Sequence, residues 1–209
     1  MALPTLIEDK DKTWLFKVTG QSREPELNKC LLGFFLGSGM TTLEICRVQV
    51  SDVIGKNGKL AKYFAVRGDV ARDFYISNIK LQNLIKDYIA KRKRDGNHPD
   101  QFLGHDPDAP LFTRANGEHF KIKRRATPAG NDSYHCNALN NHIKRLLGDA
   151  GIEQPSILSG RRTFAVRLKR NGIDVPTIHL MLGNKDLKTT YRLIDSDPVD
   201  MGALAEMAF

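Results

Sequence analysis

The chain has 209 residues, with 32 Lys and Arg against 24 Asp and Glu, and a formal charge of +8 at pH 7. This length suits one sizeable hydrophobic core rather than two full domains, and the excess of positive charge favours a polyanionic partner. Three widely spaced cysteines without a C-x-x-C pair, and the lack of a long apolar run, argue against a zinc site, a disulfide framework, a signal peptide and a membrane span.

The first half of the chain predicts helices followed by a small sheet. Apolar residues at helical spacing predict a helix over 27–35, with Pro25 suited to its first turn. Gly37 and Gly39 end this helix, and Thr41 begins a short second one that runs to Cys46. Between residues 48 and 76, short β-type runs flank turns at 57–58 and 68–69. These runs predict a three-stranded antiparallel sheet.

The second half predicts mainly helices. An apolar stripe predicts a helix over 81–89, and residues 95–132, which are rich in Gly, Pro, Asp and Asn, predict a long loop. Further helices are expected at 133–148, 160–171, 174–182 and 185–194. The fold class is therefore α+β and mostly α.

Two C-terminal motifs are more specific than this general pattern. They are Ser159-Gly-Arg-Arg-Thr-Phe-Ala-Val-Arg-Leu168 and Leu182-Gly-Asn-Lys-Asp-Leu-Lys-Thr-Thr-Tyr191. In order and spacing they resemble the catalytic domain of tyrosine recombinases, the phage integrase family, and Pro110-Leu-Phe112 adds a third landmark. The resemblance implies a helical bundle with a small three-stranded sheet. It also implies that 1–209 is one catalytic-type domain with an extension at 1–23, a tail at 195–209 and no N-terminal core-binding domain.

The resemblance assigns six positions to the family's active site, and most of them carry other residue types here. Thr41 stands for the first arginine, Arg67 for the lysine of the sheet turn, Leu158 for a histidine, Arg161 for the second arginine, Asn184 for another histidine, and Leu193 for the nucleophilic tyrosine.

These substitutions bear directly on phosphodiester transesterification, which needs a nucleophile, a positive clamp and a proton donor. Leu193 has no nucleophilic atom, Thr41 removes half of the arginine clamp, and the guanidinium of Arg67 is a poor proton donor. Tyr191 is an alternative nucleophile, but two residues along a helix rotate a side chain by about 200°, to the opposite face. We therefore expect a protein that is not an enzyme, with Leu158 and Leu193 buried in a vacated site.

Basic and polar residues predict contacts with double-stranded DNA. Residues 121–125 form one basic cluster, residues 161–170 form another, and in relatives the helix after the first cluster enters the major groove. A solvated helix face is the alternative for Arg162 and the favoured interpretation for Arg167, Lys169 and Arg170. An ordinary loop and helix cap, with Asp132 or Ser133 as the capping residue, is the alternative for the polar segment. The predicted DNA-binding residues are Thr41, Thr42, Arg67, Lys121, Lys123, Arg124, Arg125, Ser133, His135, Asn137, Asn141, Lys144, Arg161 and Arg162.

The functional expectation is a catalytically inactive, cytoplasmic protein that binds double-stranded DNA, without a metal, a cofactor or a membrane partner. It would act as a transcriptional regulator or as an accessory factor of a mobile element, plasmid or phage. One alternative is a divergent recombinase that is active alone or beside a partner subunit. The other is an interaction module whose apolar tail, through Leu204, Met207 and Phe209, contacts a second copy or a partner recombinase.

Overall fold

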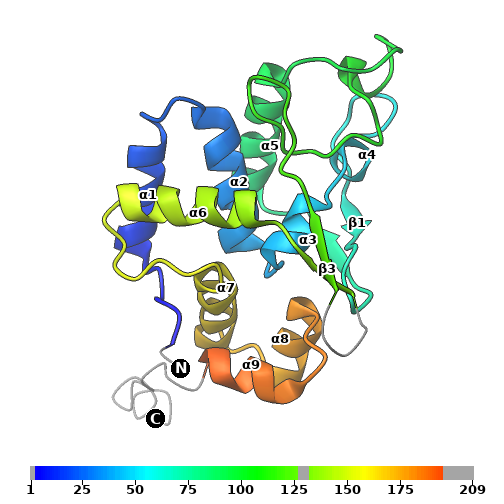
Figure 1. Cartoon of the computed structure of the whole chain (residues 1–209). Coiled ribbons are helices and arrows are strands. Elements are labelled where there is room, and N and C mark those ends of the chain that lie inside the picture. Colours follow the sequence, from blue (N-terminus) through cyan, green and yellow to red (C-terminus); the bar gives the residue numbers. More distant parts are fainter. Residues whose placement is uncertain (1–2, 127–131, 195–209) are drawn as a thin grey trace.

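The computed structural model of the protein describes residues 3–126 and 132–194, and Figure 1 shows a helical body with two small hairpins. The elements follow the chain in the order α1 (Asp9–Thr19), α2 (Pro25–Gly37), α3 (Thr42–Cys46), α4 (Val50–Val53), β1 (Tyr63–Ala65), β2 (Asp73–Tyr75), α5 (Ile79–Lys91), a 3-10 turn η1 (Phe102–Gly104), β3 (Lys123–Ala126), β4 (Asp132–His135), α6 (Asn137–Asp149), α7 (Ser159–Arg170), α8 (Val175–Leu182) and α9 (Leu187–Ile194).

Helix α2 lies at the centre of the core and contacts α1, α5 and α7 (Figure 1). Cys30, Leu31 and Phe34 on this helix are completely buried, because an apolar helix with neighbours on several sides has no face left for solvent. Gly160 at the start of α7 packs directly against α2, since a Cβ there would lie 2.2 Å from the carbonyl oxygen of Phe35. The α7 backbone is thereby held close to the centre of the molecule.

A second, smaller apolar cluster joins the last three helices. Ala165 of α7, Ile178 and Leu182 of α8, and Leu193 and Ile194 of α9 are all buried in it. These contacts hold α8 and α9 against α7 (Figure 1). Within the ranges 3–126 and 132–194, no helix is both long and apolar enough to span a membrane.

The mostly helical α+β class is confirmed, but the three-stranded sheet is wrong. Strands β1 and β2 form a two-stranded antiparallel hairpin with Phe64 opposite Phe74. The expected third strand is reduced to an isolated bridge between Ile54 and Leu60. Its preceding segment forms the short helix α4, where the Asp52 carboxylate accepts a hydrogen bond of 2.7 Å from the Gln49 backbone and caps the helix.

Helix α1 and the β3–β4 hairpin were also not expected from the sequence. Helix α1 lies within what was expected to be a short extension at 1–23. Strands β3 and β4 form an antiparallel hairpin where a loop and the start of a helix were expected, so α6 begins only at Asn137. Asn131 and the tail at 195–209 lie outside the described residues.

Candidate functional site

The site centres on Arg161, in the first turn of α7. Its side chain is 5% exposed, its Nη2 donates to Oδ1 of Asn184, and its Nη1 lies 3.9 Å from Oε2 of Glu44. Burial lowers the pKa of Arg161 to about 10, while the Glu44 carboxylate opposes that shift. The guanidinium is thus charged at neutral pH and held in one orientation by partners from two other segments.

Glu44 on α3 is the acceptor that joins two arginines. Its Oε1 and Oε2 accept from Nη1 and Nη2 of Arg72 at 2.7 and 2.9 Å, and Oε2 also accepts from the Thr41 backbone at 2.7 Å and from its hydroxyl at 3.0 Å. Burial alone would raise the pKa of Glu44, but the bonds from Arg72 and Thr41 outweigh it and hold the pKa below its usual value. The carboxylate therefore stays ionised between Arg72 and Arg161.

A chain of polar contacts continues from Arg161 into α8 and α9. Nδ2 of Asn184 donates to Oγ1 of Thr190 at 2.9 Å, and Oγ1 lies 3.0 Å from Nδ1 of His179. Thr190 is completely buried, so its hydroxyl has no access to water and depends on these two partners. Asn184 consequently ties the orientation of Arg161 to the packing of α8 and α9.

The two leucines at family active-site positions differ in their surroundings. Leu193 is 6% exposed and packs in the cluster of α7, α8 and α9, so its expected burial is confirmed. Leu158 is 43% exposed, so its expected burial is wrong, because it lies where the chain enters α7 rather than inside the helix bundle. Tyr191 is 42% exposed, whereas Thr190, Leu193 and Ile194 form the buried face of α9.

Arg67 does not join the Arg161 group in the structure. Its Nη1 is paired with Asp52, and its Nη2 donates to Oε1 of Gln49 at 2.6 Å, so the side chain is directed toward α4. Arg72, from the same β1–β2 connection, supplies the second guanidinium of the site instead.

The family resemblance matches Arg72 only to the basic residue downstream of the sheet turn, and the sequence did not point to Glu44 as a site residue. Glu44 had a usable signal, because it follows Thr41 at capping-box spacing. The position of Arg72 depends on the path of the β1–β2 connection, which no local pattern specifies. Its Nε also donates to the Met181 carbonyl at 3.1 Å, which brings α8 to the same group.

A second surface is formed by the β3–β4 hairpin and one face of α6. Lys123 lies opposite His135, and Arg125 lies opposite Ser133, in an exposed antiparallel pair. Arg124 forms an ion pair of 2.7 Å with Asp132. The exposed residues of this surface among the predicted DNA contacts are Lys121, Lys123, Arg124, Arg125, Ser133, Asn137, Asn141 and Lys144, with His135 half-buried.

The polar residues of α6 share one face. Asn137, Asn141 and Lys144 follow one another at four- and three-residue spacing and are exposed, while Leu139 and Ile143 point into the core. The hairpin is also joined to α3, because the guanidinium of Arg47 lies 5.7 Å from the centre of the Tyr134 ring. The hairpin, the end of α3 and α6 thus form one connected polar surface.

Two of the predicted DNA contacts, Thr42 and Arg162, have buried side chains in the structure. Thr42, in the first turn of α3, is 7% exposed. Arg162 is 9% exposed, and its Nη1 donates to the Pro4 carbonyl, so this side of α7 faces the N-terminal segment.

The solvated-face alternative for the end of α7 is also only partly right. Arg167 pairs with Asp9 at 2.8 Å, and Arg170 pairs with Glu8 at 2.9 Å. These two cations therefore attach the N-terminal segment and α1 to α7. Lys169 is half-buried.

The comparisons with known proteins agree with this geometry. The model of the phage integrase family matches residues 7–198. The solved XerA recombinase is similar at a TM-score of 0.69 and 19% identity, over 99% of this chain and 63% of that one. The Tn1549 transposon integrase in complex with a circular intermediate DNA is similar at 0.65 and 14%, over 100% of this chain and 66% of that one. No curated protein sequence matches the chain.

A third similar structure is the XerH site-specific recombinase bound to a palindromic difH substrate, at a TM-score of 0.63 and 18% identity, over 99% of this chain and 53% of that one. The chain therefore spans between about half and two thirds of the length of these structures, and at such identities the likeness concerns the fold.

The expectation that the protein is not an enzyme is wrong on these findings. The matching family and the similar structures are integrases and recombinases, which are enzymes, and nothing in the described part of the chain shows it to be inactive. The match spans α1 to α9 and includes Glu44, Arg161 and Asn184. The chain belongs to the phage integrase family.

Proposed function

We propose that the protein is a DNA-binding site-specific recombinase whose active site is completed between two subunits. The observation that carries this proposal is the fixed position of Arg161 beside Arg72, with both guanidinium groups held by Glu44. Two oriented cations suit a phosphodiester, because they match the charge that develops on the phosphate in the transition state.

Duplex binding is supported by the surface of β3, β4 and α6. Its basic residues suit phosphates, and amide side chains such as Asn137 and Asn141 suit base edges in a groove. We propose a cytoplasmic location because the DNA substrate must be accessible. The similar Tn1549 integrase and XerH recombinase were solved in complex with DNA, which supports DNA binding by this chain as well.

The nucleophile is proposed to come from a neighbouring subunit. Leu193 is buried and has no hydroxyl, while Tyr191 is exposed on the other side of α9. A phenol on the exposed face of α9 is accessible to a phosphate held by a second copy of the chain. In the step itself, the tyrosyl hydroxyl loses its proton and its oxygen bonds to phosphorus, while the P–O5′ bond breaks and the 5′ oxygen takes up a proton, so that no net proton is consumed.

A complementation experiment tests this arrangement. The parent protein is incubated with a nicked suicide duplex that carries a DNA site selected from a random pool, and covalent adducts are separated by denaturing electrophoresis. Tyr191→Phe and Arg161→Ala should each abolish the adduct, and their mixture should restore it, because one subunit keeps Tyr191 and the other keeps Arg161. Lys10→Ala, which changes an exposed residue of α1, is the matched control and should form as much covalent adduct as the parent protein.

The outcomes separate the two roles considered for this chain. If Tyr191→Phe abolishes the adduct and the mixture of variants does not restore it, Tyr191 and Arg161 act within one subunit. If the parent binds the duplex without forming an adduct, the recombinase proposal fails. The buried Leu193 then favours the second role, in which the chain holds DNA beside a partner recombinase that supplies the tyrosine.

Duplex binding is measured separately from chemistry. The logarithm of the association constant should fall steeply with the logarithm of the salt concentration, because each neutralised phosphate adds nearly one unit to the slope. Lys123→Ala should weaken binding to all sequences and flatten the slope by about one unit. Asn141→Ala should change sequence preference instead. Undetectable duplex binding at low salt would refute the DNA interface.

A further inference from the structure

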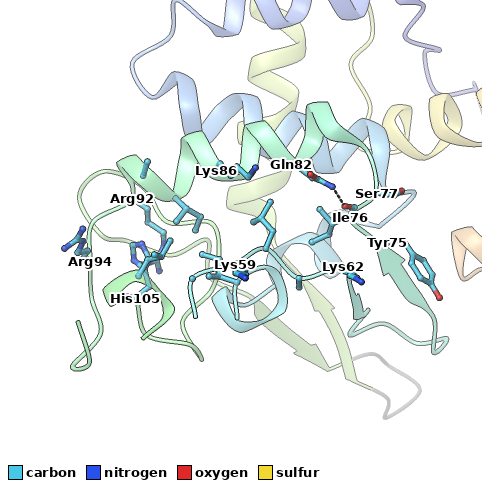
Figure 2. A pocket seen from close by; sticks show the side chains of 17 residues that line it. Lys59, Lys62, Tyr75, Ile76, Ser77, Gln82, Lys86, Arg92, Arg94 and His105 are labelled. Atoms are coloured by element: carbon cyan, nitrogen blue, oxygen red, sulfur yellow. Dashed lines mark hydrogen bonds between the residues drawn. The ribbon is translucent and has the colours of Figure 1, made fainter. Parts of the chain in front are cut away.

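A cavity of about 740 Å³ lies between α5 and the segment of residues 54–62 (Figure 2). None of its lining residues belongs to the Arg161 group or to the β3–β4 hairpin. Its volume falls in the range of pockets that enclose small organic molecules. The cavity is therefore a separate feature from the proposed recombinase site.

The cavity has an apolar floor. Ile54, Ile76 and Ile89 line it and are 1, 2 and 4% exposed, so their positions are fixed by the main core. Their side chains offer no hydrogen-bonding atoms, and water against them has few partners. This floor suits an apolar aryl or acyl group.

The rim of the cavity is cationic. No carboxylate lines the cavity, and in the described part of the chain no ion pair engages its lysines or Arg94. Figure 2 shows Lys86 of α5 and Lys59 of the opposite segment on either side of the cavity, with Lys62 farther along the same segment. Arg92 is different, because its guanidinium already binds Asp95 and carbonyl groups. The available positive charge therefore comes from the rim, above the apolar floor.

A strained turn supplies the remaining wall. Phe102 and Leu103 have φ values of +49° and +55°, a left-handed conformation that residues with a side chain rarely adopt. The turn places Leu103 at the cavity, where the side chain stays 47% exposed. A Cβ at Gly58 would lie 2.6 Å from Cδ2 of Leu103, so glycine at 58 makes room for it. Backbone strain of this kind clusters at functional sites, ligand clamps among them.

We infer that this cavity binds a small amphipathic organic anion. The apolar body lies on the isoleucine floor under Leu103, and a carboxylate or phosphate group lies between Lys59 and Lys86. The three observations are independent of one another. The floor selects an apolar body, the lysines, which form no ion pair in the described residues, select an anion, and the strained turn adds an apolar contact from Leu103.

Isothermal titration calorimetry with three naphthalene probes tests the inference. The probes are 1-naphthoate, 1-naphthyl phosphate and the neutral 1-naphthalenemethanol. Both anions should bind, the neutral probe should bind at least about 10-fold more weakly, and the stronger anion identifies the headgroup. Lys59→Ala/Lys86→Ala should weaken both anions by about 10-fold or more, whereas Lys10→Ala/Lys188→Ala, which removes the same charge elsewhere, should leave them unchanged.

Leu103→Gly is the second variant, and it guards against loss of folding as an explanation. Glycine tolerates positive φ, so this variant should keep or raise the melting temperature while it weakens all three probes. Equal binding of the neutral probe, unchanged binding by the lysine variant or by Leu103→Gly, or no binding at millimolar probe would overturn the inference. Displacement of the anions by short duplex DNA would also overturn it, because the lysines would then belong to a DNA surface.

Discussion

Replacement of Glu44 by glutamine tests the central carboxylate of the site. The variant keeps the shape of the side chain but removes the negative charge between Arg72 and Arg161, whose side chains are 8 and 5% exposed. Loss of one partner from a buried ion pair costs about 3–5 kcal/mol, because the remaining charge stays buried without compensation. Since the glutamine oxygen can still accept one bond from Arg72, we expect the lower end, about 3 kcal/mol.

The free energy of unfolding is measured by urea titration followed by circular dichroism. For a chain of this size, a loss of about 3 kcal/mol lowers Tm by roughly 6–12 °C. Glu118→Gln is the control, because Glu118 is exposed, and it should change stability by less than about 0.5 kcal/mol. A loss under about 1 kcal/mol in Glu44→Gln would show that the two arginines do not depend on this carboxylate.

Three further perturbations have expected outcomes. Leu193→Ala should lower the unfolding free energy by about 2–5 kcal/mol in urea titrations, because Leu193 is buried. Leu158→Ala should lower it by less than about 0.5 kcal/mol, because Leu158 is exposed, and equal losses would contradict the packing. Burial, with nearby Arg145, lowers the pKa of His142 from 6.5 to about 4, so stability should be fully present above pH 6.5 and fall as the pH drops toward 4. His142→Gln should make the unfolding free energy less dependent on pH between 6.5 and 4, whereas His98→Gln, at an exposed position, should not change that dependence. The Sγ atoms of Cys46 and Cys136 lie 3.1 Å apart, so hydrogen peroxide should oxidise them to a disulfide with release of water. Mass spectrometry should detect the loss of two hydrogens, and Cys46→Ala should abolish it. A disulfide that includes Cys30 instead would contradict the geometry.

The sequence was sufficient for elements that are specified by local pattern. The apolar stripe of residues 27–35 and the motif that begins at Ser159 each predicted a helix, because burial of one face repeats with the helical period. The β3–β4 hairpin escaped prediction because its residues are nearly all exposed and polar, so no apolar alternation marks them. Local pattern therefore identifies elements that bury a face and misses those that do not.

The site was only partly predictable for a related reason. Arg161 and Asn184 lie in the recognisable motifs, and the structure brings them together. Arg72 reaches Glu44 from 28 positions along the chain, and Arg162 turns to Pro4 from 158 positions away, so both placements follow from packing rather than sequence spacing. Charge in a sequence thus indicates a polyanionic partner without indicating which cations are available to it.

The pairing of Arg167 with Asp9 and of Arg170 with Glu8 has a practical consequence for any measurement of DNA affinity. The N-terminal segment acts as a local counterion for the end of α7. A shortened protein that begins after Asp11 would leave both arginines without these carboxylates, and its affinity for any duplex would rise through charge alone. High salt would weaken the same two pairs along with the phosphate contacts. Comparisons between proteins of different N-terminal length would therefore mix two electrostatic effects, and sequence preference is the safer measure of specific recognition.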